Sequence, residues 1–340
     1  MRRSITCLIA VVAFAMVAAP AWACGGLVAP NGTVNLLRTT TLAGYHGGVE
    51  HYVTSFEFVG GGGKFGSIIP LPGIPSDVVR GGDWTLQRLV EEVRPPQPEV
   101  RAVALESADA AMSAEVVLET RIDALDITVL RGGADEVGRW ALDNGFALPP
   151  DAPEILEFYA SRSPIFMAAR FDAAAAERLG QQKGDGTPIH LSIPTQNPWV
   201  PLRILTLGRQ ASETVEADVF LLTDVEPNLL PRPGKTMSLE LSERASGRLI
   251  EDLRSDKGME WIPESGMWLS YLKIDTDASS LVHDLAIDAS GLTTPSKVAA
   301  GLVVPQDLVE IADRNPLWAW ALSALLVVGV VSFANRFVAK

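Results

Sequence analysis

The chain has 340 residues, with 28 Lys and Arg against 41 Asp and Glu, which gives a formal net charge of −13 at pH 7. An acidic surface of this kind repels nucleic acid and anionic lipid headgroups, so both classes of partner are disfavoured. Cys7 and Cys24 are the two cysteines, too few for a zinc site with four thiolate ligands.

The N-terminal segment has the three parts of a secretory signal peptide. Arg2 and Arg3 form a positive n-region, residues 8–18 are apolar, and residues 21–23 read Ala-Trp-Ala. We therefore predict a signal peptide over residues 1–23.

Cleavage after this segment would make Cys24 the first mature residue and the only mature cysteine, so no intramolecular disulfide is expected. Its position makes Cys24 a candidate for lipidation, although the two residues at 21 and 22 differ from those of a usual lipoprotein site.

The first part of the mature chain is rich in β-strand signals. Runs at residues 34–42 and 49–58 flank a glycine-rich turn and predict a β-hairpin. A helix is expected after Asp83, whose side chain can cap it, because apolar residues recur at helical spacing through residues 86–93.

From residue 115 onward, short β-prone runs surround two predicted helices, at residues 134–144 and 153–161. The expected strands lie at residues 115–122, 126–130, 165–171, 189–193, 202–207 and 215–222. Because helices are few and do not alternate regularly with strands, we predict an α+β fold with a mostly antiparallel β-sheet. This extracytoplasmic α+β domain is assigned to residues 24–225.

A proline-rich stretch at residues 226–234 marks the expected domain boundary. It begins a membrane-proximal α+β extension over residues 226–315, with a helix at 243–257 and strands at 267–274 and 281–287. No internal repeat is found.

The C-terminal segment has the pattern of a membrane anchor. Seventeen residues, 317–333, carry no charge, which approaches the length that a helix needs to cross a bilayer. We predict a transmembrane helix over residues 316–335 and a cytoplasmic tail over 336–340, since Arg336 and Lys340 favour the cytoplasmic side. The expected localisation is the cell membrane, single-pass, with the bulk of the chain extracytoplasmic.

Residues 61–66 match the dinucleotide-binding pattern G-x-G-x-x-G, but the context excludes it. That site needs a helix N-terminus facing the pyrophosphate, and a proline-terminated strand follows here. No cofactor is therefore predicted.

Two weak sets of metal ligands are present. His46 and His51 lie across the predicted hairpin and could share a metal with an acid such as Glu50, although surface histidines are the simpler interpretation. Asp275 and Asp277 supply oxygen ligands but depart from the calcium-loop pattern, so solvated carboxylates are the default. No catalytic constellation is identified.

Several short segments together resemble the domain of unknown function 2330, a family of uncharacterised secreted bacterial proteins. They are residues 23–26 (ACGG), 65–72 (FGSIIPLP), 144–149 (NGFALP), 188–193 (PIHLSI) and 201–204 (PLRI). The resemblance implies an extracytoplasmic domain, often with a C-terminal span, and it implies no activity, cofactor or catalytic residue.

These observations favour a membrane-anchored binding or scaffolding module of the cell envelope, with the membrane and an envelope protein as partners. The proline-rich loops at residues 71–75 and 197–201 are the expected contact surfaces. The alternative is a metal-dependent surface hydrolase that uses His46, His51 and neighbouring acids.

Overall fold

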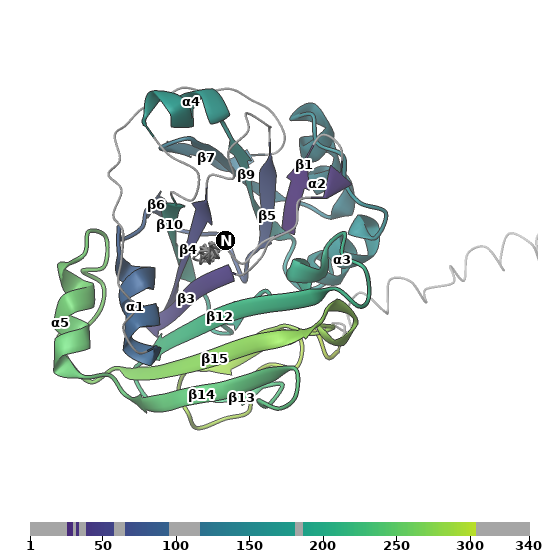
Figure 1. Cartoon of the computed structure of the whole chain (residues 1–340). Coiled ribbons are helices and arrows are strands. Elements are labelled where there is room, and N and C mark those ends of the chain that lie inside the picture. The colour runs from purple at the N-terminus through teal and green to yellow at the C-terminus, as the bar shows by residue number, and fades with distance from the viewer. Residues whose placement is uncertain are drawn as a thin grey trace, which may run out of the picture.

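The computed structural model describes residues 26–29, 32–33, 39–57, 65–94, 116–180 and 186–303. Two large β-sheets and five α-helices make up this part of the chain, with a small third sheet beside them (Figure 1). The α+β class with mostly antiparallel strands is therefore confirmed.

The larger sheet has seven strands in the order β14-β15-β12-β3-β4-β10-β6. Their bounds are β14 Met237–Arg244, β15 Trp268–Asp277, β12 Thr214–Thr223, β3 Thr39–His46, β4 Val49–Glu57, β10 Gly186–Pro194 and β6 Asp77–Arg80. Within this sheet β3 and β12 pair in parallel, whereas the other neighbours are antiparallel.

The second sheet has six antiparallel strands in the order β2-β1-β5-β9-β8-β7. Their bounds are β2 Gly32–Thr33, β1 Gly26–Ala29, β5 Gly66–Pro70, β9 Ile165–Phe171, β8 Leu125–Arg131 and β7 Val116–Ile122. The small sheet is β11-β16-β13, formed by Trp199–Val200, Leu285–Asp288 and Asn228–Leu230.

The main core lies between the inner faces of the two large sheets. Because side chains alternate along a strand, each strand gives every second residue to this core. In β4, Tyr52 joins the inner core, whereas Val53 joins a second core on the outer face of the seven-stranded sheet.

Helices cover the two outer faces. α1 (Thr85–Val93) and α5 (Gly247–Ser255) lie side by side and cover the outer face of the seven-stranded sheet (Figure 1). α2 (Ala134–Asp143) and α3 (Ala152–Ala160) pack against the outer face of the six-stranded sheet. α4 (Ala173–Arg178) and the short 3₁₀ helices η1 (Arg203–Thr206) and η2 (Ala278–Ser280) complete the helices of the described segments.

The cap of α1 comes from a distant residue, so the prediction that Asp83 caps this helix is wrong. The Asp256 carboxylate accepts hydrogen bonds from the backbone N–H groups of Asp83, Trp84 and Thr85, at 3.0, 2.9 and 2.8 Å. These donors lie at the start of the helix and just before it, where no partner is available within the helix, and the buried carboxylate satisfies them. The cap fastens α1 to the segment that follows α5.

Strands on both sides of residue 226 belong to one sheet. β15 follows that position, yet it pairs along its whole length with β12, which precedes it. Residues 226–303 therefore complete the same folded unit.

The expected helix at residues 243–257 is shorter, because β14 continues to Arg244 and Ser246 caps α5 by accepting from the Leu249 N–H. No helix within the described ranges is long and apolar enough to cross a membrane. The predicted signal peptide (1–23), Cys24 and the predicted span (316–335) lie outside those ranges.

Candidate functional site

Three histidines lie on the outer face of the seven-stranded sheet, one on each of three adjacent strands. His46 is in β3, His51 in β4 and His190 in β10, and the register aligns Gly44 with His51 and Val53 with His190. His51 and His190 are thus diagonal neighbours on one face, a separation that long side chains can bridge. Their ring nitrogens, Nδ1 of His51 and Nε2 of His190, are 2.9 Å apart and hydrogen-bonded.

Trp261, from the segment between α5 and β15, covers this pair. Its ring stacks on His51 with a centroid distance of 3.9 Å and an interplanar angle of 3°. Gly44 permits this contact, since a Cβ there would lie only 2.1 Å from the indole Cη2. His51 and His190 consequently have relative exposures of only 9% and 5%.

Burial keeps both imidazoles neutral. Desolvation, together with the nearby His190 and His46, lowers the pKa of His51 to about 3. Desolvation likewise lowers the pKa of His190 to about 4, although Asp77, Glu260 and the Gly258 backbone oppose this shift. At neutral pH each ring therefore has one N–H and one lone pair, and one ring donates to the other.

Two buried polar atoms of this cluster lack a well-formed hydrogen bond. The Nε1 of Trp261 and the Nδ1 of His190 are buried without a hydrogen bond of good geometry, although the Gly258 backbone lies close enough to favour protonation of His190. Buried polar atoms without partners are uncommon in folded proteins. We therefore treat His51, His190 and Trp261 as the candidate site.

The other residues of the predicted histidine site do not join this pair. The Nδ1 of His46 pairs with Asp224 at 2.8 Å on the surface, where the two side chains are 44% and 49% exposed. Glu50 cannot join His51 in a metal site, because successive residues of β4 point to opposite faces of the sheet. In the described segments no three His, Cys, Asp or Glu residues gather closely enough to hold a metal ion.

Glu50 is instead a buried acid on the inner face. Its Oε2 accepts a long hydrogen bond of 3.3 Å from the Trp199 N–H, and its Oε1 has no partner. Desolvation raises the pKa of this carboxyl to about 8, so it is protonated at neutral pH.

The acids of the weak calcium pattern are also separated. Asp275 lies near the end of β15 beside the Lys273 ammonium group, at 3.3 Å, and Asp277 ends the same strand; both are exposed. Asp288 accepts hydrogen bonds from Ser290 and Thr293 in a surface turn. Asp284 is fully buried in a different network.

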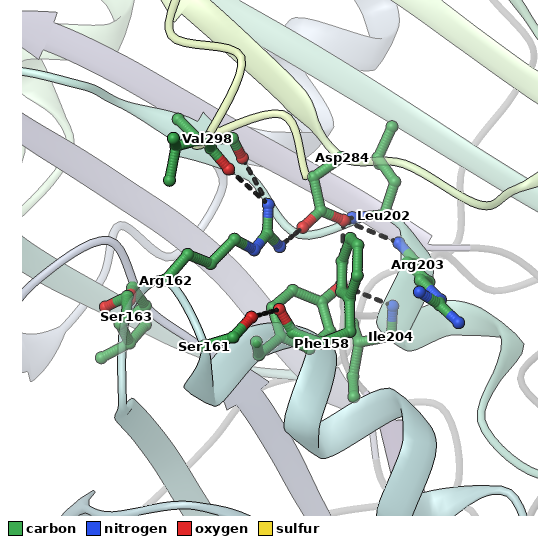
Figure 2. A network of polar contacts seen from close by, with 12 residues as sticks. Phe158, Ser161, Arg162, Ser163, Leu202, Arg203, Ile204, Asp284 and Val298 are labelled. Atoms are coloured by element: carbon green, nitrogen blue, oxygen red, sulfur yellow. Dashed lines mark hydrogen bonds and ion pairs between the residues drawn. The ribbon is translucent and has the colours of Figure 1, made fainter. Parts of the chain in front are cut away.

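That network connects residues from four places in the chain (Figure 2). The Arg162 guanidinium pairs with Asp284 and donates to the carbonyl oxygens of Val298 and Ala299. The Asp284 Oδ1 accepts from the Leu202 and Arg203 N–H groups at 2.7 and 2.8 Å.

Aromatic rings enclose this network. The Arg162 guanidinium carbon lies 4.2 Å from the Phe158 ring centroid and 4.7 Å from that of Trp199. The Tyr159 hydroxyl donates to Asp284 at 2.9 Å and accepts from the Ile204 N–H at 2.8 Å. Nearly every polar atom is paired, which indicates a structural role.

Three loops converge at one end of the seven-stranded sheet, and we call residues 47–48, 72–76 and 194–197 the loop cluster. The Thr195 N–H donates to the Gly48 carbonyl at 3.1 Å, and the Thr195 carbonyl accepts from the Tyr45 hydroxyl at 2.9 Å. The Ser76 N–H and hydroxyl both donate to the Ser192 carbonyl, at 2.8 and 3.0 Å. These bonds join residues 47–48 to residues 194–197 and fasten the loop at residues 72–76 to β10.

The exposed part of the second proline-rich loop differs from the prediction. Residues 198–201 are buried, because Trp199 and Val200 form β11, whereas residues 194, 196 and 197 are exposed. In the first loop Ile74 and Ser76 are exposed, but Leu71 and Pro75 are buried.

Sequence reasoning missed His190, Trp261 and the Arg162–Asp284 pair. His190 occupies an alternating strand, a pattern typical of an ordinary half-buried residue. The register of β4 against β10 is the signal that pairs it with His51, and 139 residues separate the two.

Comparison with solved structures gives distant similarities. Crystal structures of baculovirus P35, of a mutated P35 after caspase cleavage at 3.1 Å resolution, and of the caspase-8/P35 complex match with 10, 7 and 8% identity and TM-scores of 0.39, 0.40 and 0.34. The matches cover 74, 75 and 74% of this chain and 96, 98 and 90% of the other chains. No curated protein sequence matches.

A family model matches residues 18–226. Its description is "Uncharacterized protein conserved in bacteria (DUF2330)". The match ends between β12 and β13, so β13, β14, β15 and β16 lie beyond it.

Proposed function

The chain belongs to the DUF2330 family of uncharacterised proteins conserved in bacteria, and from this premise we propose that it is a membrane-anchored, extracytoplasmic binding module of the cell envelope. The signal-peptide pattern of residues 1–23 and the uncharged run of residues 317–333 support export and anchoring. The acidic net charge supports a protein partner with a basic surface.

The loop cluster is the observation that carries the binding role. Recognition surfaces are commonly formed by loops that a rigid sheet holds in place. Here a backbone hydrogen bond joins residues 47–48 to residues 194–197, and Ser76 fastens the third loop to β10. Ile74 and Asn197 extend from this base into solvent. Such a preordered surface loses little conformational entropy when a partner binds.

Site-specific photocrosslinking in intact cells tests this role. A photoreactive residue at Ile74 or at Asn197 should give a discrete crosslinked product of the same partner from both positions. Leu142 is the matched control, because it is 73% exposed and belongs to α2, which packs on the six-stranded sheet and lies outside the loop cluster. Equal products from all three positions, or none from the loop cluster, would contradict the proposal.

Topology is tested separately. Protease added to spheroplasts should degrade the body of the chain and leave a short protected fragment that contains Lys340. Protection of the body with loss of an epitope at Lys340 would reverse the proposed orientation.

A further inference from the structure

The histidine pair under Trp261 presents two ligand atoms that face each other. The His51 Nδ1 and the His190 Nε2 are 2.9 Å apart, and both rings are almost completely buried. Because both rings are neutral, a change of tautomer makes both facing nitrogens lone-pair donors. Neutral imidazole nitrogens are good ligands for late transition metals.

The number of ligands selects the kind of ion. Structural zinc sites use four ligands, and calcium sites use six to eight oxygens. In the described residues no third His, Cys, Asp or Glu joins the two histidines, so the pair has too few ligands for either ion. We propose that His51 and His190 bind one monovalent d¹⁰ cation, Cu⁺ or Ag⁺, between their facing nitrogens in linear two-coordinate geometry.

The geometry requires a small adjustment. Two metal–imidazole bonds of about 2 Å place the nitrogens about 4 Å apart, so the rings must separate by about 1 Å from their metal-free distance. The movement can be taken up by the segment that carries Trp261, which has no regular secondary structure between Ser255 and Trp268.

Metal binding at this site requires a change of tautomer but no net loss of a proton. In the metal-free pair one facing nitrogen bears the shared proton, and on metal binding that proton moves to the other nitrogen of the same ring. For His190 the receiving atom is Nδ1, which has no well-formed hydrogen bond and lies near the Gly258 backbone. Each imidazole keeps one proton, so binding releases none.

The surroundings favour a cation. Asp77 and Glu260 are close enough to His190 to raise its pKa, so they also attract a metal cation electrostatically. The Trp261 ring lies parallel to His51 and presents its π-face beside the site, where a partly desolvated cation gains further stabilisation. Glu260 is exposed and belongs to the segment that covers the site.

Silver titration of the full chain tests the site. All samples carry Cys7→Ser and Cys24→Ser, because thiolates would compete for a soft ion, and Ag⁺ is used in nitrate buffer without chloride. We expect one equivalent of Ag⁺ to shift the ¹⁵N resonances of His51 Nδ1 and His190 Nε2, with no proton release between pH 6 and 8.

Matched variants separate this pair from other ligands. His51→Gln and His190→Gln should each weaken Ag⁺ binding by more than about 100-fold. Loss of a residue that only hydrogen-bonds to a metal ligand costs up to about 100-fold, and loss of the ligand itself should cost more. His46→Gln removes an exposed imidazole from the same face and should leave the affinity unchanged.

Two results would overturn the site. One is a wild-type spectrum in which saturating Ag⁺ leaves both histidine resonances unmoved, which decides the matter even if the variants do not fold. The other is a folded double variant, His51→Gln with His190→Gln, that binds Ag⁺ as tightly as the parent chain.

Discussion

Arg162 and Asp284 form an ion pair that is almost completely buried, with side-chain exposures of 3% and 0%. The pair joins the end of α3 to the segment that leads toward the C-terminus, and Asp284 also holds the start of η1 through two backbone N–H groups. Because 122 residues separate the two partners, the ion pair closes a long loop of the chain.

Breaking this pair should destabilise the whole fold. Removing one member of a buried ion pair leaves the other charge without compensation, a cost of about 3–5 kcal/mol. We expect Arg162→Met and Asp284→Asn each to lower the free energy of unfolding in urea by that amount, and the double variant to lose less than the sum. Arg139→Gln, which breaks an exposed pair with Glu136, should cost less than about 1 kcal/mol. Full additivity would show that the two residues act independently.

The histidine pair should make the metal-free fold sensitive to acid. The folded-state pKa values of His51 and His190, about 3 and about 4, lie below the usual value of 6.5, so the unfolded chain binds more protons below pH 6.5. Stability therefore falls as the pH drops from 6.5 toward 4, by at most about 2 kcal/mol for each histidine at pH 5.

Urea denaturation at pH 7.5 and pH 5 measures this effect. A folded His51→Gln, His190→Gln variant should lose less stability between the two pH values than the wild type does. His46→Gln, which removes an exposed histidine, should behave like the wild type. Parallel losses in all three proteins would rule out the buried pair as the cause.

Local sequence patterns predicted several elements well because their side-chain periodicity decides their structure. The strand expected at residues 165–171 matches β9, and the helix expected at 134–144 matches α2 within one residue. Each of these elements has one face that must be buried, and alternation or helical spacing reveals that face directly.

Long-range contacts decided the features that the sequence did not reveal. The parallel pairing of β3 with β12 joins segments far apart in the chain. The cap of α1 comes from Asp256, whereas the Asp83 carboxylate pairs with Arg80. A long-range contact also decides which residue is the partner of His51 in the candidate site. His51 was singled out beside its near neighbours His46 and Glu50, whereas the sheet register gives it His190 as a partner and places Glu50 on the opposite face.

Glu50 should make the fold less stable as the pH rises. Its folded-state pKa of about 8 lies above the ordinary value of 4.5, so the folded chain retains a proton that the unfolded chain releases. This contribution to stability is fully present below pH 4.5 and is lost between pH 4.5 and 8, which amounts to about 3 kcal/mol at pH 7.

The isosteric variant Glu50→Gln removes the titration and keeps an oxygen for the Trp199 N–H. We expect it to raise the free energy of unfolding at pH 7 by up to about 3 kcal/mol and to have little effect near pH 4.5. Glu251→Gln, on the exposed side of α5, should change neither value. A Glu50→Gln protein that is less stable at both pH values would indicate an ionised carboxylate in the fold.

Gly44 should be required for the position of Trp261. A Cβ at Gly44 would lie 2.1 Å from the indole Cη2, so Gly44→Ala must push the ring off the sheet and off His51. Overpacking of this kind costs about 1–3 kcal/mol. The displaced indole should give a red-shifted tryptophan emission and a weaker near-ultraviolet circular dichroism signal.

Gly138→Ala in α2 is the control for this prediction, because the added Cβ would lie 3.9 Å from the nearest Leu148 atom and would meet no clash. The gain in helix propensity should stabilise the chain by about 1 kcal/mol. Unchanged spectra and stability in Gly44→Ala would mean that Trp261 does not stack on the histidine pair.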